Sequence, residues 1–167
     1  MKTVQISVVN LDLSFNVGDT VHICKGASVD VEATLNPPVN LISWTPLDGL
    51  QVLGNGLNVV ANPTSSTLYS ATAVVPGCTR IKNLYIAVDS LPANLALHPS
   101  DTTICPGETV LLGSATYNPL AYPGIEFQWF PAQGQDTLSE LLVKPDETTT
   151  YLRTTTNGVC LDSALAT

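Results

Sequence analysis

Residues 103–110 read TICPGETV, and residues 22–29 of the same chain read HICKGASV. Each phrase places a cysteine before a glycine-containing turn that leads into β-prone residues. The two cysteines, Cys24 and Cys105, are 81 positions apart in a chain of 167 residues. A phrase that returns at this distance indicates a structural unit that occurs twice.

Other landmarks return in the same order. The matched pairs are Trp44 with Trp129, Tyr69 with Tyr151 and Cys78 with Cys160, separated by 85, 82 and 82 positions. The larger separation of the tryptophans indicates an insertion before the second one. The sequence therefore predicts two repeats, at residues 10–91 and 92–167.

The two ends of the chain fit this division differently. Residues 2–9, KTVQISVV, resemble residues 82–88, KNLYIAV, which close the first repeat. We therefore expect residues 1–9 to be the trailing strand of a preceding repeat or an N-terminal extension. The second repeat stops before an equivalent closing run, so its last strand is in question. We interpret the chain as a window of a longer array.

Short alternating runs separated by Gly, Pro and Asn fill the first repeat. Apolar and polar residues alternate with a period of two, which is the pattern of half-buried strands at the spacing of a β-sandwich. Residues 137–143 are the one candidate for a turn of helix. The expected strands are residues 29–33, 41–44, 57–61, 67–74 and 84–88.

The charge of the chain excludes several partners. Only six Lys and Arg residues face fourteen Asp and Glu residues, for a net charge of −8. Binding to nucleic acid or to an anionic membrane requires clustered positive charge, so neither is expected. No apolar run approaches the length that spans a bilayer, so no membrane insertion is expected. The N-terminus lacks the apolar segment of a signal peptide.

The four cysteines favour structural disulfides. They are too widely spaced for a zinc site, and no Cys-x-x-Cys pair or adjacent base marks a reactive thiol, so no metal or cofactor is expected. One pair per repeat at matched positions favours the bridges Cys24–Cys78 and Cys105–Cys160. Disulfides persist in oxidising compartments, so we expect an exported protein located outside the cell or at the cell surface.

Geometry sets a condition on these bridges. In a seven-strand Greek key, the turn before the second strand and the turn after the sixth lie at opposite ends of the sandwich. That separation exceeds the reach of a disulfide. A bridge within one repeat therefore requires a single strand, not two, between the tryptophan strand and the tyrosine strand. The alternative is that Cys24 pairs with Cys160.

The phrases TICPGETVLL, FQWFPA and VKPDETTTYLRTTTNGVC resemble the Ig-like or PKD-like repeats of large secreted and cell-surface proteins of Bacteroidota. These include gliding-motility adhesins and other cargo of the type IX secretion system. The resemblance covers both repeats and implies an all-β fold of two tandem Ig-like (PKD-like) β-sandwiches. It leaves the activity of the parent protein open, because such modules accompany many functions.

Several aromatic residues are candidates for ligand binding. The two tryptophans and the tyrosines Tyr69 and Tyr151 alternate with apolar neighbours, so we expect them in the core, with the phenol hydroxyls bonded to a loop. The insertion TYNPLAYPGIEF, residues 116–127, places Tyr117 and Tyr122 in a loop. An aromatic loop on a rigid scaffold is a plausible place for recognition of glycans or proteins, and equally for an ordinary inter-domain contact.

Asp followed by Ser or Thr recurs along the chain. The pattern resembles the O-glycosylation sequon of exported Bacteroidota proteins, although it also occurs wherever a turn leads into a strand. The residues that the sequon would modify are Thr20, Ser90, Thr102, Thr137 and Ser163.

Two acidic residues near the junction of the repeats, Asp89 and Asp101, are candidates to share a calcium ion, but the sequence contains no calcium-binding loop.

The sequence favours a non-enzymatic module. It has two histidines, and neither lies in a motif with a nucleophile, so catalysis is not expected. The favoured function is a disulfide-stabilised structural or adhesive spacer of a large surface or secreted bacterial protein. Its partners would be the neighbouring repeats, with the linker of residues 88–97 setting the angle between them. The alternative is a carbohydrate- or protein-binding accessory module of a secreted enzyme.

Overall fold

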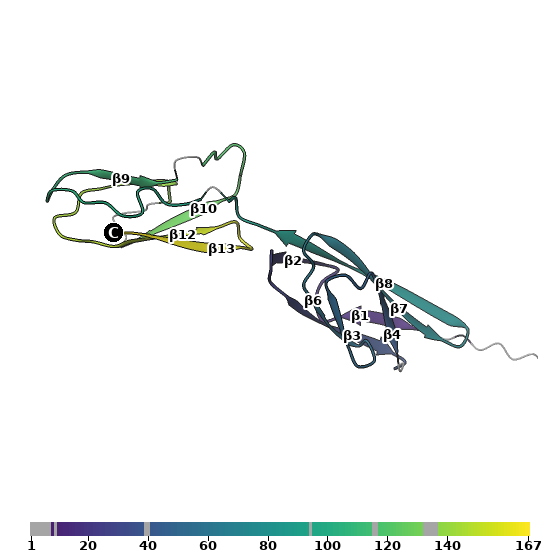
Figure 1. The fold of residues 1–167 in the computed structure, drawn as a ribbon. Coiled ribbons are helices and arrows are strands. Elements are labelled where there is room, and N and C mark those ends of the chain that lie inside the picture. The colour runs from purple at the N-terminus through teal and green to yellow at the C-terminus, as the bar shows by residue number, and fades with distance from the viewer. Residues whose placement is uncertain (1–7, 9, 39–40, 94, 115–116, 132–136) are drawn as a thin grey trace, which may run out of the picture. The chain divides into compact units, whose positions relative to one another are not determined.

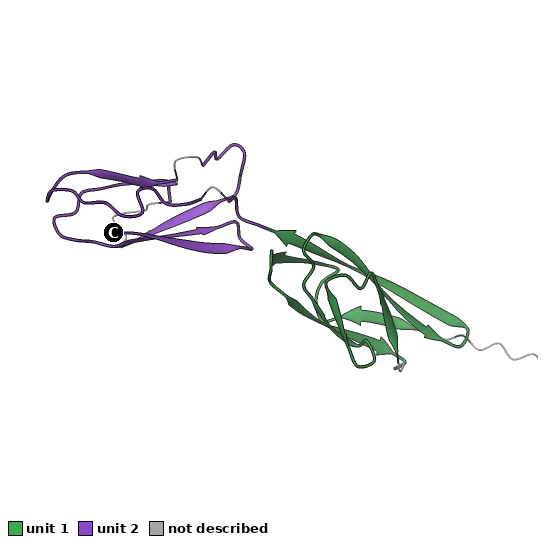
Figure 2. Ribbon diagram, viewed as in Figure 1, with its two compact units in different colours: residues 1–89 green, residues 90–167 purple. Residues whose placement is uncertain are grey.

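The computed structural model describes residues 8, 10–38, 41–93, 95–114, 117–131 and 137–167. Every regular element among these residues is a strand (Figure 1). The chain divides into two compact units, residues 1–89 and 90–167 (Figure 2). The division falls two residues before the boundary at 91 and 92 that the repeats suggested. Most of the predicted N-terminal strand, residues 1–9, lies outside the described residues.

One sheet of unit 1 is antiparallel, with the order β1-β3-β6-β5. Strand β3 alternates regularly, so that Val31, Ala33 and Leu35 are buried while the residues between them are exposed. Such alternation is expected where one face of a sheet packs on the core and the other meets water. The strands are β1 (Asp12–Phe15), β3 (Val29–Asn36), β5 (Leu50–Leu53) and β6 (Asn58–Ala61).

The second sheet of unit 1 has the order β2-β8-β7-β4. Strands β7 and β8 form a long antiparallel hairpin, visible in Figure 1, and β4 pairs antiparallel with β7. Strand β2 runs parallel to the second half of β8. The strands are β2 (Thr20–Cys24), β4 (Ile42–Thr45), β7 (Thr67–Val75) and β8 (Cys78–Asp89).

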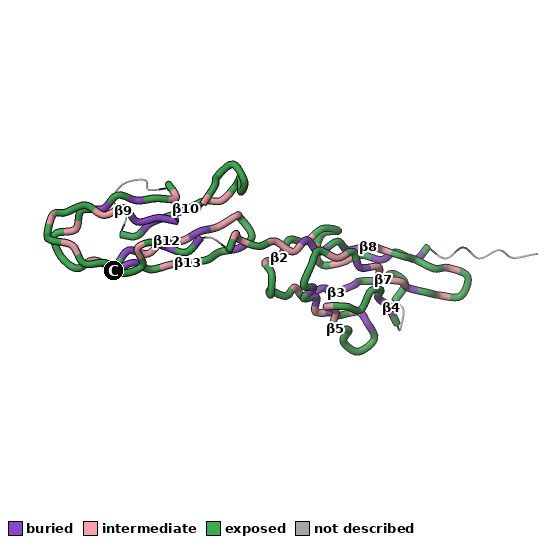
Figure 3. Tube along the Cα trace, turned by 45° about the horizontal axis from the view of Figure 1, so that its top comes forward, coloured by how far each residue is buried: buried purple, intermediate pink, exposed green. Residues whose placement is uncertain are grey.

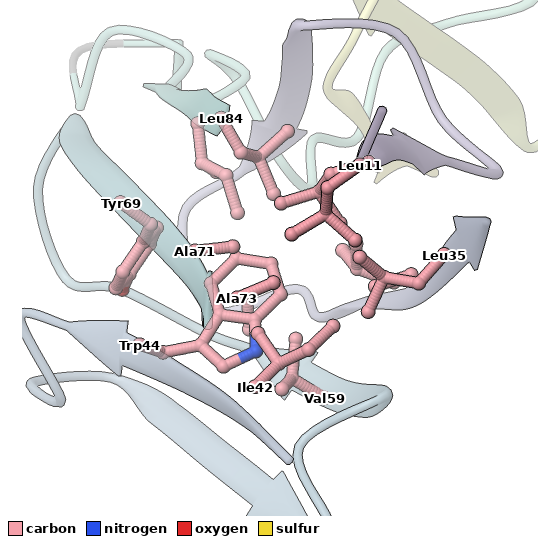
Figure 4. Packing of buried hydrophobic residues seen from close by; sticks show 14 of the residues in the cluster. Leu11, Leu35, Ile42, Trp44, Val59, Tyr69, Ala71, Ala73 and Leu84 are labelled. Carbon is pink, nitrogen blue, oxygen red and sulfur yellow. The ribbon is translucent and has the colours of Figure 1, made fainter. Parts of the chain in front are cut away.

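The inner faces of the two sheets share one hydrophobic core. Figure 3 shows buried and exposed positions following one another along these strands. Trp44 on β4 lies opposite Ala71 on β7, and Ile42 lies opposite Ala73. The small alanine side chains leave room for the indole ring, which lies beside Ala73 and Ile42 in Figure 4. Pairing large with small residues fills an interior without voids.

Unit 2 repeats the two-sheet plan with fewer strands in its described residues. Its sheets have the orders β10-β12-β13 and β11-β9, and a bridge joins His98 to Gly113 of β9. Strand β11 occupies most of residues 137–143, the one candidate for a turn of helix, so that candidate was wrong. The strands are β9 (Val110–Gly113), β10 (Glu126–Phe130), β11 (Glu140–Val143), β12 (Tyr151–Thr156) and β13 (Leu161–Ala166).

Strand β13 is the counterpart of the first part of β8. Tyr151 pairs with Ala166 in unit 2, as Tyr69 pairs with Leu84 in unit 1. The closing strand of the second repeat, which the sequence left in question, is therefore present up to the position equivalent to Leu84. A separate core cluster lies between the sheets of unit 2.

Candidate functional site

Both tryptophans are core residues. Trp44 and Trp129 are buried on the inner faces of β4 and β10. Trp44 Nε1 donates a hydrogen bond to the carbonyl oxygen of Gly56 at 2.8 Å, and Trp129 Nε1 donates to that of Leu138 at 2.9 Å. Gly56 and Leu138 occupy equivalent places in the two repeats. The indoles are therefore not available as sugar-stacking platforms. Both tryptophans lie in the core, where the sequence led us to expect them.

The two equivalent tyrosines are also buried. The hydroxyl of Tyr69 donates to the carbonyl oxygen of Asp48 at 2.7 Å, which ties β7 to the loop before β5. Burial raises the pKa of the Tyr69 phenol, the charge of Asp48 raises it further, and a hydrogen bond with Thr67 opposes these effects. Tyr151 is buried at the matching position of β12. These tyrosines are structural.

The predicted bridge between Cys24 and Cys78 is wrong, because Cys78 is a free thiol. Cys24 pairs in register with Asp89, the last residue of β8, whereas Cys78 is the first residue of that strand. Eleven residues of extended chain span about 36 Å, against the 4.4–6.8 Å between Cα atoms that a disulfide allows. Two strands, β5 and β6, separate β4 from β7, which is the arrangement that excludes this bridge.

The predicted bridge between Cys105 and Cys160 is also wrong, although β11 is the one described strand between β10 and β12. Cys160 belongs to the turn between β12 and β13, where its carbonyl oxygen accepts a hydrogen bond from the amide of Asn157. Cys105 follows Thr102, whose amide donates to Thr167 just beyond the other end of β13. Cys105 is an exposed free thiol. The disulfide-bonded cysteines are Cys24 and Cys160, so the expectation of one bridge in each repeat is corrected.

The two tyrosines of the aromatic loop, Tyr117 and Tyr122, have different surroundings. The ring of Tyr117 packs edge-on against Phe127 with 5.0 Å between centroids, and its hydroxyl donates to the carbonyl oxygen of Tyr122 at 3.3 Å. The amide of Tyr122 donates in turn to the carbonyl of Asn118. Tyr117 thus holds the loop onto the sandwich. Tyr122 itself is 42% exposed, and its neighbour Leu120 is 91% exposed.

The inner face of β12 contains a charged residue that sequence reasoning missed. Arg153 is buried, and it lies opposite Trp129 where unit 1 has Ala71 opposite Trp44. Its guanidinium carbon lies 5.4 Å from the ring centre of Phe127 and 5.6 Å from that of Trp129. Contacts with two aromatic faces offset part of the cost of removing the charge from water.

Hydrogen bonds connect Arg153 to distant parts of unit 2. One terminal nitrogen donates to Ser114 Oγ at 2.7 Å, and the other donates to the carbonyl oxygen of Leu95. Burial lowers the pKa of the guanidinium, and the charge of Asp162 partly opposes this effect. The sequence signal was available, since Arg153 follows Tyr151 by two positions and therefore faces inward with it.

Comparison with solved structures identifies the architecture. Drosophila OTK, extracellular domains 3–5, matches at a TM-score of 0.57 and 16% identity, over 93% of this chain and 60% of that one. Both units are immunoglobulin-like β-sandwiches. The titin domains z1z2 in complex with telethonin match at a TM-score of 0.41 and 20% identity, over 96% of each chain. No known family model and no curated protein matches the chain.

The candidate glycosylation residues lie on the surfaces of the immunoglobulin-like units. Access to a modifying enzyme requires such exposure, and all of the predicted acceptors have it. Their modification stays a prediction. The exposed residues are Thr20, Ser90, Thr102, Thr137 and Ser163.

Asp89 and Asp101, the candidates to share a calcium ion, belong to different units, and a shared ion stays a prediction. No group of three His, Cys, Asp or Glu side chains in the described part of the chain could hold an ion. His22 Nδ1 lies 2.8 Å from Asp89 Oδ2, and Asp101 is exposed. No helix long and apolar enough to cross a membrane was found in the described residues.

Proposed function

We propose that the chain is a pair of non-enzymatic structural modules that space and present other parts of a larger exported protein. The observation that carries this proposal is that each unit closes its own core around its own tryptophan and tyrosine. A unit of this kind keeps its shape without a ligand. The disulfide-bonded state of Cys24 and Cys160 supports an oxidising environment outside the cell.

Single-molecule stretching of the chain under reducing conditions tests the spacer function. Two independently folded units give two separate unfolding events, one from each core. Gly56→Ala, which strains only unit 1, should weaken one event and leave the other unchanged. A single smooth extension without distinct events would contradict the proposal.

The parent protein in this proposal is a surface or secreted protein of Bacteroidota, of the gliding-adhesin type and exported by type IX secretion. It rests on the resemblance of the cysteine, tryptophan and tyrosine phrases. The sequence of the parent gene tests it, because further repeats or a sorting domain would support the assignment. An adjoining catalytic domain would favour the accessory module of a secreted enzyme instead.

Recognition of a glycan or protein by the aromatic loop is the second candidate function. The exposure of Tyr122 and Leu120 favours it, and the hydrogen bond from Tyr117 to Tyr122 within the loop would reduce the entropy lost on binding. Binding on a glycan array should disappear with Tyr122→Ala and persist with Tyr85→Ala, a matched control that is 40% exposed in unit 1. Equal binding by both variants would exclude this loop as the site.

A further inference from the structure

The segment that leads from the linker into unit 2, residues 95–98, is held at both of its ends. His98 exchanges two backbone hydrogen bonds with Gly113, at 2.8 and 2.9 Å. At the other end Leu95 is buried, and its carbonyl oxygen accepts a hydrogen bond from a terminal nitrogen of Arg153. We call this segment the entry strap.

Arg153 joins the entry strap to the strand with which the strap pairs. The other terminal nitrogen of the same guanidinium donates to Ser114 Oγ at 2.7 Å. Ser114 directly follows Gly113, which is the last residue of β9 and the bridge partner of His98. The arginine therefore provides a second connection between the strap and β9, beside the backbone bridge.

Unit 1 holds the equivalent segment by strand pairing. There β1 pairs with β3 along its whole length, with Leu13 opposite Leu35. Leu13 corresponds to Leu95, because both are buried three residues before an amide that bonds to the next strand, β3 or β9. Ala71 takes the place of Arg153. In the described residues of unit 2, one bridge and an arginine thus replace a ladder.

The clamp formed by Arg153 is incompletely bonded. Its guanidinium is buried, and Nε has no hydrogen-bond partner among the described residues. A buried donor without an acceptor has lost its bond to water and gained none. Release of the strap would break the bond to Leu95 but would let water reach the guanidinium. That hydration offsets part of the loss and brings the released state closer in free energy to the closed one.

We propose that the entry strap is a releasable tether, which Arg153 holds closed and whose release lengthens the linker while the core of unit 2 stays folded. The inference rests on the proposed spacer function, in which load reaches unit 2 through the strap. The next connections along the chain are those of Ser100 and Thr102 with Thr167. Release of residues 95–99 therefore adds up to about 17 Å of chain.

Amide hydrogen exchange of the full chain tests the strap directly. In the wild type, the His98 amide should exchange by local opening, faster than the amides of β12, the central strand of its sheet. Arg153→Met keeps an apolar side chain against the two aromatic rings but removes the clamp. It should speed exchange at His98 at least about tenfold more than exchange in β12, because a charged hydrogen bond is lost.

Val143→Ala is the matched control for this experiment. It removes buried methyl groups from β11 without removing a hydrogen bond of the strap, so it should speed exchange at His98 and in β12 alike. Equal effects of Arg153→Met at the two places would overturn the proposal. Exchange at His98 that is as slow as in β12 in the wild type would also overturn it, since the strap would then open only with the core.

Single-molecule stretching separates this proposal from the spacer function. Under reducing conditions, release of the strap should appear as an extension of up to about 17 Å before the core of unit 2 unfolds, and at lower force in Arg153→Met. Absence of two core unfolding events would contradict the spacer function itself. Two such events without the earlier extension would leave the spacer function in place and overturn the releasable tether.

Discussion

Cys24 and Cys78 lie at opposite ends of β8, with Cys24 level with its last residue and Cys78 at its first. Neither Cys78 nor Cys105 is in a bridge. Alkylation of the folded chain without reductant should therefore label these two cysteines, and Cys24 and Cys160 should be labelled only after reduction. Peptide mass mapping measures the difference. Finding Cys78 in a disulfide would contradict the structure.

Gly56 should tolerate no side chain. Its φ of +81° disfavours L-residues, and an added Cβ would lie 2.1 Å from the carbonyl oxygen of Ile42. Gly56→Ala should destabilise unit 1 by about 4 kcal/mol or more, because the backbone that accepts the Trp44 hydrogen bond must move. Denaturant unfolding followed by tryptophan fluorescence measures the loss.

Gly54 offers the matched control for this substitution. It also has a positive φ, +56°, but an added Cβ meets nothing within 4 Å. Gly54→Ala should cost only about 1–2 kcal/mol, the penalty of the left-handed conformation alone. Equal losses in the two variants would show that contact with Ile42 is unimportant.

The hydroxyl of Tyr69 should make unit 1 sensitive to alkaline pH. The phenol pKa is raised above its ordinary value of 10.0 by burial and by Asp48. Below pH 10 the group is protonated in both the folded and unfolded chains. Above it the unfolded phenol ionises first, so the free energy of unfolding falls as the pH rises towards the folded pKa.

Urea unfolding at several pH values, each in wild type and Tyr69→Phe, measures this effect. The variant should lose about 1 kcal/mol at neutral pH, because the hydrogen bond to Asp48 is gone. It should also lose the part of the alkaline destabilisation that Tyr69 causes. Tyr85→Phe, at an exposed position, should retain that part because Tyr69 is untouched.

Arg153 should be essential to unit 2 although it is charged. Arg153→Ala removes the packing against Phe127 and Trp129 and leaves Ser114 and the Leu95 carbonyl without their donor. We expect a loss of about 3 kcal/mol or more. Arg153→Lys should also destabilise, because an ammonium cannot reproduce the planar fork.

Thermal unfolding of unit 2 measures the effect of these substitutions. Arg80→Ala is the control, since Arg80 is an exposed residue of unit 1 and its removal should change stability by less than about 0.5 kcal/mol. A similarly small effect of Arg153→Ala would mean that the buried guanidinium is replaceable at no cost.

Much of the fold could be predicted because its strands are half-buried. The expected runs of unit 1 correspond to β3, β4, β6, β7 and β8. Alternation marks such strands directly, whereas β2 and β5 have little buried surface and gave no signal. The core positions of both tryptophans followed from the same alternation.

The pairing of the cysteines could not be predicted from matched positions alone. Repetition shows that two residues occupy equivalent places, but it does not show that they are close. The deciding fact was the number of strands between β4 and β7, and β5 is the strand that the sequence did not reveal. The burial of Arg153 was missed because charge suggested exposure, although its spacing from Tyr151 placed it on the inner face.

The parallel pairing of β2 with β8 has a mechanical consequence. Tension that pulls the start of β2 and the end of β8 apart acts along both strands in opposite directions. The five paired positions between Thr20 and Cys24 are then loaded together in shear and cannot open one after another like a hairpin. Strand β2, which pairs parallel with β8 while the other strand pairs of unit 1 are antiparallel, would thus resist such a force from its beginning.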